Sequence, residues 1–222
     1  MNHPVKIHLD SIALSGDIAY GNTPKAWVIF VHGSGSSRQS IRNKMVAKIL
    51  NQHSYGTLLF DLLTETEDKN YHMRFDIPLL ADRLRQVTQW FMESSFYHKE
   101  PIAFFGASTG AGAALMAVGK SLDHDPFFTV ISRGGRPDLA DIKFLHNISR
   151  PVLLLVGSLD FEVIQLNQLA QNELADAELV LIPGATHLFD EVGTLDKVVQ
   201  KSIDWLDKHL PKEKYHQERP SL

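Results

Sequence analysis

The chain has 222 residues, of which 44% are apolar and 22% are charged, and its formal net charge is −4. This length suits one sizeable α/β domain, and the mild negative charge without a basic stripe argues against nucleic acid as a partner. The chain contains no cysteine, which excludes disulfides, thiolate metal sites and cysteine nucleophiles.

Short apolar runs alternate with longer amphipathic stretches, a pattern that predicts repeated β-α units around a mostly parallel sheet. The N-terminal residues include no apolar leader and the longest apolar runs are strand-sized, so we expect a cytoplasmic protein that does not engage a membrane. Strands are predicted at residues 5–9, 12–20, 26–31, 57–62, 102–105, 127–132, 152–157 and 178–182. Helices are predicted around residues 41–50, 77–91, 111–116, 162–174 and 195–209.

Several local expectations accompany these elements. The first two strands are expected to form a hairpin that turns at residues 15–17 (SGD). One face of the first helix is expected to carry Ile41, Met45, Val46, Ile49 and Leu50, which fall at helical spacing. An acidic loop is expected around residues 65–68. Residues 1–210 are interpreted as a single domain and residues 211–222 as a polar, frayed C-terminal tail.

Residues 106–110 (GASTG) place Ser108 where the strand at 102–105 turns into a helix. This is the G-x-S-x-G pattern of a nucleophile elbow, in which glycines allow a sharp turn and the serine hydroxyl projects above the sheet. The following helix N-terminus offers N–H groups to a developing anion. Ser108 could instead cap that helix. Because the pentapeptide alone is a weak signal, the prediction depends on partners elsewhere in the chain.

Two polar residues follow later strands in the order that such a serine needs. Asp160 comes directly after the strand at 152–157, and His187 follows the strand at 178–182 within PGATH. The carboxyl ends of parallel strands meet at one edge of a sheet, so these side chains are expected to converge. We therefore predict Ser108 as nucleophile, His187 as its base and Asp160 as the group that orients His187.

Each of these residues has an alternative interpretation. Asp160 could cap the next helix, and His187 could be a surface histidine. Asp190 and Glu191 lie close to His187 and could replace Asp160 as the acid, and Asp138 is a more distant reserve.

A glycine-serine loop (HGSGSS, residues 32–37) follows the strand at 26–31. We predict an oxyanion hole formed by the backbone N–H groups of Ser34 and Thr109. Gly33 would let the backbone of the loop approach the substrate carbonyl, and His32 would brace the loop. The loop lacks the order of a phosphate-binding P-loop, and the chain has no H-E-x-x-H motif. We therefore expect no cofactor and no metal.

Arg133 and Arg136 follow the strand at 127–132 and could clamp a carboxylate or phosphate of the substrate. Alternatively, one of them pairs with Asp138 or Asp141 and shapes the loop. Three further arginines are candidates that we interpret as surface charges: Arg38, Arg42 and Arg74. Only residues 133–150 separate this strand from the next, which leaves no room for a large lid.

With these residues in place, the chain resembles the α/β-hydrolase superfamily and, more narrowly, its dienelactone-hydrolase-like branch. The phrases HGSGSSRQSIRN, LLFDLLTETED, GASTGAGAAL, SRGGRPDLA and PGATHLFDE are similar to a bacterial subgroup of small serine hydrolases, sometimes fused to phosphoribosyltransferase-like domains. The resemblance implies a mostly parallel twisted sheet with helices on both faces, minimal or no lid, and the same roles for the residues above. Dienelactone hydrolases proper use a cysteine nucleophile, so the resemblance does not extend to dienelactone as the substrate.

The predicted function is that of a serine hydrolase, which cleaves a small ester or thioester through an acyl-enzyme on Ser108. Its partner is a small-molecule substrate, with an acidic group if an arginine binds it. Two other functions are compatible with the same residues: acyl transfer to an acceptor other than water, and ligand binding without catalysis.

Overall fold

The computed structural model describes residues 2–120 and 125–212. The strands are Asn2–His8 (β1), Ala13–Ala19 (β2), Ala26–Val31 (β3), Tyr55–Phe60 (β4), Ile102–Ala107 (β5), Phe127–Arg133 (β6), Val152–Gly157 (β7) and Ala177–Ile182 (β8). The longer helices are Ile41–Gln52 (α1), Ile77–Glu93 (α3), Thr109–Gly119 (α4), Phe161–Glu173 (α6) and Thr194–His209 (α7). Shorter helical segments are Glu65–Asp68 (α2), Tyr71–Phe75 (η1), Pro137–Leu139 (η2) and Ile142–His146 (α5). Most of the predicted tail, residues 213–222, lies outside the described residues.

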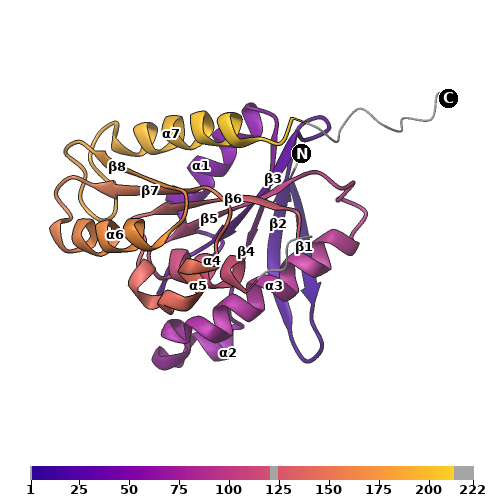
Figure 1. Ribbon diagram of the computed structural model, residues 1–222. Helices are drawn as coiled ribbons and strands as arrows, with labels where there is room; N and C mark the ends of the chain where they lie inside the picture. The colour runs from indigo at the N-terminus through magenta and orange to yellow at the C-terminus, as the bar shows by residue number, and fades with distance from the viewer. Residues whose placement is uncertain (1, 121–124, 213–222) are drawn as a thin grey trace.

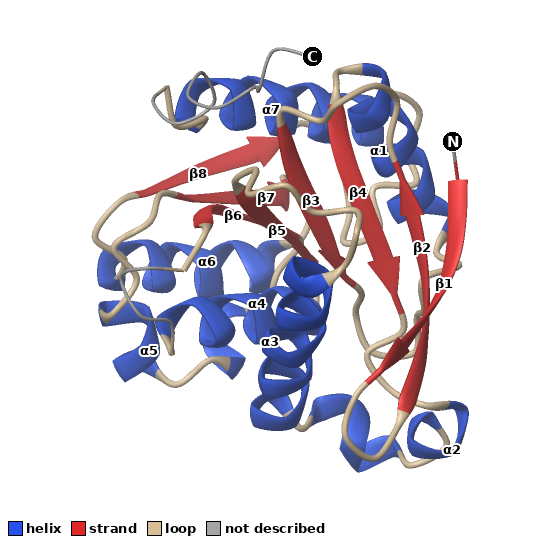
Figure 2. Ribbon diagram, turned by 90° about the vertical axis from the view of Figure 1, so that its right-hand side faces the viewer, coloured by secondary structure: helices blue, strands red, loops and turns tan. Residues whose placement is uncertain are grey.

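All eight strands form one sheet, with α1 and α7 on one face and α3, α4, α5 and α6 on the other (Figure 1). The strand order is β1-β2-β4-β3-β5-β6-β7-β8. β2 runs antiparallel to both β1 and β4, and the six strands β3 to β8 all run parallel to one another (Figure 2). The predicted fold class is therefore confirmed. Because β3 lies between β4 and β5, the chain reverses its winding direction there, and the loops after β3 and β5 open into one crevice.

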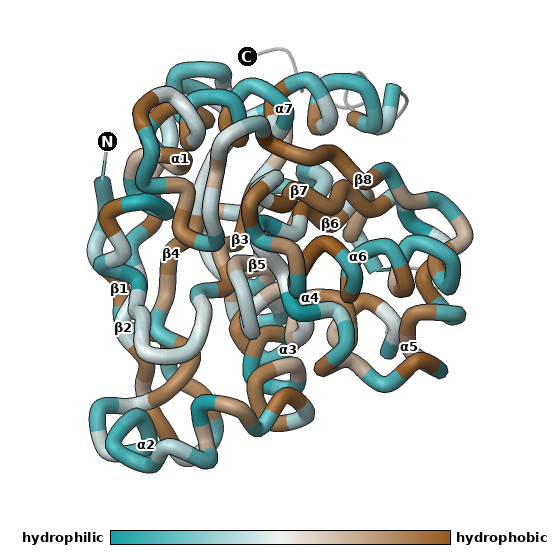
Figure 3. Tube along the Cα trace, turned by 90° about the vertical axis from the view of Figure 1, so that its left-hand side faces the viewer, coloured by the Kyte–Doolittle hydropathy of each residue, from teal (hydrophilic) through white to brown (hydrophobic). Residues whose placement is uncertain are grey.

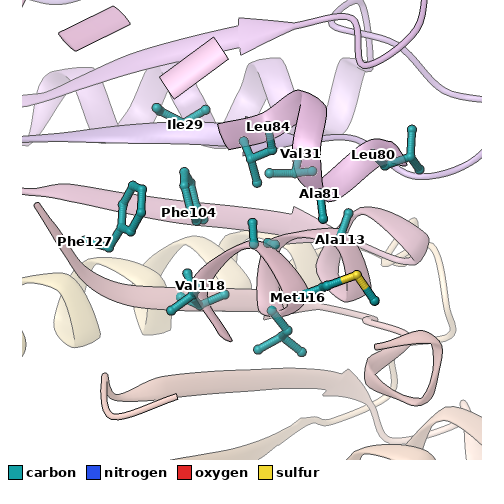
Figure 4. Packing of buried hydrophobic residues seen from close by; sticks show 14 of the residues in the cluster. Ile29, Val31, Leu80, Ala81, Leu84, Phe104, Ala113, Met116, Val118 and Phe127 are labelled. Carbon is teal, nitrogen blue, oxygen red and sulfur yellow. The ribbon is translucent and has the colours of Figure 1, made fainter. Parts of the chain in front are cut away.

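The core consists of two apolar layers, one on each face of the sheet. Neighbouring residues on a strand point to opposite faces, so Phe104 packs with α3 and α4 while Phe105 packs with α1 and α7. Figure 4 shows Phe104 in the first layer with Leu84 of α3 and Ala113 of α4. The hydrophobic colour in Figure 3 follows the central strands, as expected for parallel strands buried on both faces.

The hairpin between β1 and β2 does not turn at residues 15–17, so this prediction was wrong. The turn lies between Leu9 and Ile12, where the Leu9 N–H donates to the Ile12 carbonyl at 2.9 Å. Gly16 instead lies inside β2 opposite Val5, and a Cβ on it would approach the Val5 side chain to 3.0 Å. Close packing against β1 therefore explains the glycine.

The buried face of α1 matches the prediction in part, because Val46 and Leu50 are buried as expected and Ile49 is half-buried. Ile41 is 87% exposed and Met45 is 38% exposed. The buried stripe is made of Asn43, Val46, Ala47 and Leu50. These positions are spaced as one helical face, and Asn43 belongs to it because its Oδ1 accepts from Arg133 in the interior.

The expected acidic loop is a short helix, α2. The Thr64 hydroxyl accepts from the Glu67 N–H at 3.2 Å, and the Glu67 carboxylate accepts from the Thr64 N–H at 2.8 Å. This reciprocal capping satisfies two backbone donors. Arg83 of α3 donates to the same carboxylate and holds the pKa of Glu67 below its ordinary value.

The segment between β6 and β7 contains only η2 and α5. This confirms that no large lid is inserted there. The C-terminal edge of the sheet therefore stays open next to Ser108, which is only half-buried.

Candidate active site

Ser108 lies at the turn between β5 and α4, with φ 51° and ψ −123°. A positive φ is unusual for a residue with a side chain and marks a tightly constrained turn. A Cβ on Gly106 would lie 2.4 Å from the Ala111 Cα, and one on Gly110 would lie 2.2 Å from the Val31 carbonyl oxygen. Glycine is therefore required on both sides of the serine. Ser108 occupies the N-cap position of α4, yet its side chain makes no capping hydrogen bond.

The structure brings Ser108, His187 and Asp160 together. The Ser108 Oγ lies 3.3 Å from Nε2 of His187, and Nδ1 of His187 lies 2.7 Å from Oδ2 of Asp160. Because an ionised carboxylate only accepts, Nδ1–H donates to Asp160 and Nε2 is left to accept from the Ser108 hydroxyl. This arrangement can move a proton from Ser108 to His187 while Asp160 stabilises the imidazolium that forms.

Asp160 serves His187 rather than the helix that follows it. It stands at the N-cap position of α6, but its side chain makes no capping hydrogen bond. The Asp160 side chain is 14% exposed, and that of His187 is 38% exposed. The pair is therefore partly shielded from water and still reachable from solvent.

Glu191 and Asp190, the two carboxylates near His187 that were alternatives to Asp160, bind other residues. Glu191 accepts from the Thr186 hydroxyl at 2.6 Å and from the Thr186 N–H at 3.2 Å. Asp190 forms an ion pair with Arg42 at 2.8 Å. Both carboxylates therefore brace the loop that carries His187, and neither contacts the imidazole.

His32 holds the loop that follows β3. Its Nδ1–H donates to the Gly33 carbonyl at 3.0 Å, and its Nε2 accepts from the Leu62 N–H at 3.0 Å. Burial lowers the pKa of His32, so the ring stays neutral and keeps both contacts. A Cβ on Gly33 would lie 3.1 Å from the Ser108 Cβ, so this loop packs directly against the elbow.

The two predicted oxyanion donors are neighbours, but one of them is occupied. The Ser34 N–H donates to the Thr109 Oγ1 at 2.7 Å. The Thr109 N–H starts α4 and makes no hydrogen bond to any described residue. The Thr109 side chain, which sequence reasoning did not consider, therefore lies at the centre of this site. The only signal for it was a threonine directly after the predicted nucleophile.

Arg133 is buried beneath the His187 loop. It is 6% exposed, donates from Nη2 to the Asn43 Oδ1 at 3.2 Å, and lies over the Phe189 ring with 5.7 Å between the guanidinium carbon and the ring centroid. Burial lowers the pKa of Arg133 to about 10. Asn43 had no recognisable role in the sequence, because only the fold places α1 beside the end of β6.

Arg136 binds a carboxylate of its own loop. Its Nε and Nη2 donate to the two Asp138 oxygens at 2.8 and 2.7 Å. This is the alternative considered from the sequence, in which an arginine shapes its own loop. It also means that Asp138, the third alternative to Asp160, is paired with Arg136. The other candidate arginines form ion pairs as well: Arg38 with Asp17 and Asp61, Arg42 with Asp190, and Arg74 with Asp68.

A small pocket, open to solvent, adjoins the loop of residues 32–35, which is called the oxyanion loop below after its predicted role. Residues 32–35 form one wall, and Leu62, Leu63 and Leu80 form an apolar surface. Asp68 and Arg74 supply its polar side. Within residues 2–120 and 125–212, no group of three His, Asp or Glu side chains could hold a metal ion. In the same ranges, no helix has the length and apolar character needed to cross a bilayer.

Comparisons with known proteins agree with this architecture. No protein-family model matches the chain. The crystal structure of a dienelactone hydrolase from Anabaena variabilis is 41% identical, with a TM-score of 0.90 over 95% of this chain and 99% of that one. Est1E from Butyrivibrio proteoclasticus is 16% identical, with a TM-score of 0.78 over 93% and 98% of the two chains. A dienelactone-hydrolase-like promiscuous phosphotriesterase from metagenomic libraries is 11% identical, with a TM-score of 0.78 over 95% and 99%.

Curated relatives occur in two strains of Mycobacterium tuberculosis. Both are provisionally named phosphoribosyl transferases, and both are 45% identical over 210 residues, or 93% of this chain. The chain spans only 46% of their length.

Proposed function

The chain belongs to the dienelactone-hydrolase-like branch of the α/β-hydrolase superfamily, and on this premise we propose that it is a serine hydrolase that cleaves small esters or thioesters. The observation that carries the proposal is the continuous contact from Ser108 through His187 to Asp160, at 3.3 and 2.7 Å. A serine hydroxyl is a poor nucleophile unless a base removes its proton, and this arrangement supplies that base.

Acylation begins when His187 Nε2 takes the Ser108 proton as Oγ bonds to the substrate carbonyl carbon. The carbonyl oxygen becomes an oxyanion, which is stabilised at the N-terminus of α4 by the Thr109 N–H. When the tetrahedral intermediate collapses, the bond to the leaving alcohol or thiol breaks and His187 returns the proton to it. Ser108 is then acylated.

Deacylation repeats these steps with water. His187 removes a proton from water, the hydroxide oxygen bonds to the acyl carbon, and the bond to Ser108 Oγ breaks as the proton returns to the serine. The open C-terminal edge of the sheet gives water access. An alcohol entering in place of water would make the same machinery an acyltransferase.

The pocket beside the oxyanion loop supports a small substrate. It is open to solvent and encloses little more than the space of a water molecule, so its apolar residues Leu62, Leu63 and Leu80 favour a small acyl group over a long one. An acidic group on the substrate would have to compete with the partners that both arginines already have within the protein, Asn43 for Arg133 and Asp138 for Arg136.

The name of the Mycobacterium relatives does not decide the reaction of this chain. Those proteins are more than twice as long as the segment that the chain matches, since it covers 46% of each. We propose that the portion shared with this chain is hydrolytic, because this chain itself matches the Anabaena dienelactone hydrolase over 99% of that protein.

A fluorophosphonate probe tests the proposal. Ser108 Oγ should displace fluoride from phosphorus, and mass spectrometry should locate the adduct on the peptide that contains Ser108. Ser108→Ala should abolish both labelling and the hydrolysis of p-nitrophenyl acetate. The matched control is Ser158→Ala, because Ser158 also lies at the end of a strand near the site but accepts from the Gly184 N–H instead of contacting His187.

The other functions give different results. Labelling that persists in Ser108→Ala would refute the nucleophile. Wild-type protein that neither labels nor hydrolyses short esters would indicate a binding protein. Esters formed with added alcohols, rather than free acid alone, would indicate acyl transfer.

A further inference from the structure

The Thr109 hydroxyl occupies the place where two backbone donors were expected to meet. Its Oγ1 accepts from the Ser34 N–H at 2.7 Å, and the side chain is only 4% exposed. Close backbone packing produces this contact, because a Cβ on Gly33 would lie 3.0 Å from the Ala107 carbonyl oxygen and 3.1 Å from the Ser108 Cβ. The Ser34 amide is thus aimed at the residue that follows the nucleophile.

The direction of this hydrogen bond leaves the hydroxyl hydrogen unused. An amide can only donate, so the threonine oxygen is the acceptor and its own hydrogen is available. None of the hydrogen bonds among the described residues uses that hydrogen. A buried hydroxyl whose hydrogen has no acceptor is costly, unless a ligand supplies one.

We propose that the Thr109 hydroxyl is itself a donor of the oxyanion hole and that the Ser34 amide holds it in position. This inference rests on the proposed hydrolase function. The substrate oxyanion then accepts from the N–H and the O–H of the same residue, Thr109. Accepting a hydrogen bond from Ser34 polarises the hydroxyl and strengthens it as a donor. Thr109 is therefore a catalytic residue through its side chain as well as its backbone.

The competing arrangement makes the opposite prediction for one substitution. If the Ser34 amide binds the oxyanion directly, the threonine hydroxyl blocks it and must rotate away. Thr109→Val keeps the branched shape and removes the hydroxyl, which frees the amide. Under that arrangement the variant would match or exceed the wild-type kcat.

Under our proposal, Thr109→Val should lower kcat for p-nitrophenyl acetate about 100- to 1,000-fold, the usual loss for one oxyanion donor. KM should change little, since the oxyanion forms only in the transition state. Thr109→Ser keeps the hydroxyl and should retain kcat within about ten-fold of wild type. An aryl trifluoromethyl ketone, which forms a tetrahedral adduct with Ser108, should lose affinity for Thr109→Val in parallel with kcat/KM.

Thr88→Val is the matched control. Thr88 is 2% exposed and donates to the Leu84 carbonyl at 2.8 Å within α3, away from the site. It should leave kcat unchanged, and circular dichroism should show that all variants fold. If Thr109→Val does not fold, Thr109→Ala replaces it in the same comparison.

Three results overturn the proposal: an unchanged or higher kcat in Thr109→Val, an equal loss in Thr109→Ser, or a loss seen only in KM. Failure of the hydrolase assignment looks different. In that case wild-type protein gives no fluorophosphonate label, or Ser108→Ala retains activity, whatever happens at Thr109.

Discussion

Removing the Asp160 carboxylate should greatly slow the reaction while leaving the fold intact. Asp160→Ala deletes the acceptor that holds His187 Nδ1 at 2.7 Å. The imidazolium formed in the transition state then loses its counter-charge, and the ring loses its fixed tautomer. Because the Asp160 side chain makes no capping hydrogen bond to α6, the change should cost little stability.

The size of the effect follows from the geometry. Opposite charges whose centres are about 4 Å apart attract by about 4 kcal/mol at an effective dielectric constant of about 20. At about 1.4 kcal/mol for each factor of ten, that loss alone lowers kcat about 1,000-fold. Losing the orientation of the ring adds to this, so we expect a decrease of about 1,000- to 10,000-fold for Asp160→Ala.

Asp160→Asn should fall at the lower end of this range. The second carboxylate oxygen, Oδ1, accepts no hydrogen bond from a described residue, so nothing fixes which way an amide would turn. The amide oxygen can face Nδ1 and preserve the tautomer, and only the charge is lost. Its kcat should therefore lie about 1,000-fold below that of wild type.

The assay is kcat for p-nitrophenyl acetate, with Glu191→Gln and Asp190→Asn as controls. Both residues brace the His187 loop through Thr186 and Arg42, so each change should cost less than about ten-fold. A kcat for Asp160→Ala within ten-fold of wild type would refute the assigned role. An equally large loss in either control would identify that residue as the acid instead.

Three further predictions concern the surroundings of the site. The lowered pKa of His32 means that below about pH 6.5 the unfolded chain binds a proton that the folded protein does not, so the unfolding free energy should decrease as the pH is lowered through this range. His32→Gln, which can still accept from the Leu62 N–H, should show a smaller decrease when the unfolding free energy is measured by urea titration at each pH. Because Asp138 already holds the Arg136 fork, Arg136→Ala should change kcat/KM equally for neutral and acidic esters, and a loss confined to acidic esters would show that Arg136 binds substrate. Leu63→Phe should reduce the pocket beside the oxyanion loop and lower kcat/KM more for hexanoyl than for acetyl esters, whereas equal effects would place the acyl group elsewhere.

Apolar periodicity predicted most of the fold because the central strands are buried on both faces. The predicted strands at 26–31 and 152–157 match β3 and β7 to the residue. The failures occurred where a polar residue lies inside or a glycine has a packing role. Asn43 is buried against Arg133, and Gly16 is packed against Val5, and neither contact exists until distant segments meet.

The site shows the same division. Ser108, Asp160 and His187 could be placed from the sequence because each directly follows a strand, and parallel strands end at one edge. A side-chain contact within one loop was within reach of the sequence, since the Arg136–Asp138 pair was one of the alternatives considered. The Ser34–Thr109 contact was not, because it depends on how closely two loops approach after the chain has folded.

Two glycines explain how the chemistry at Ser108 depends on residues far from it in sequence. Gly110 allows the first turn of α4 to lie against the end of β3, where a Cβ would approach the Val31 carbonyl oxygen to 2.2 Å. Gly33 allows the loop after β3 to return onto the elbow, 3.1 Å from the Ser108 Cβ. The Ser34 amide can therefore reach the Thr109 hydroxyl only while both close approaches hold. A side chain at either glycine would displace the oxyanion loop as a unit, so we attribute the position of the proposed oxyanion donors to backbone packing as much as to the residues that bear them.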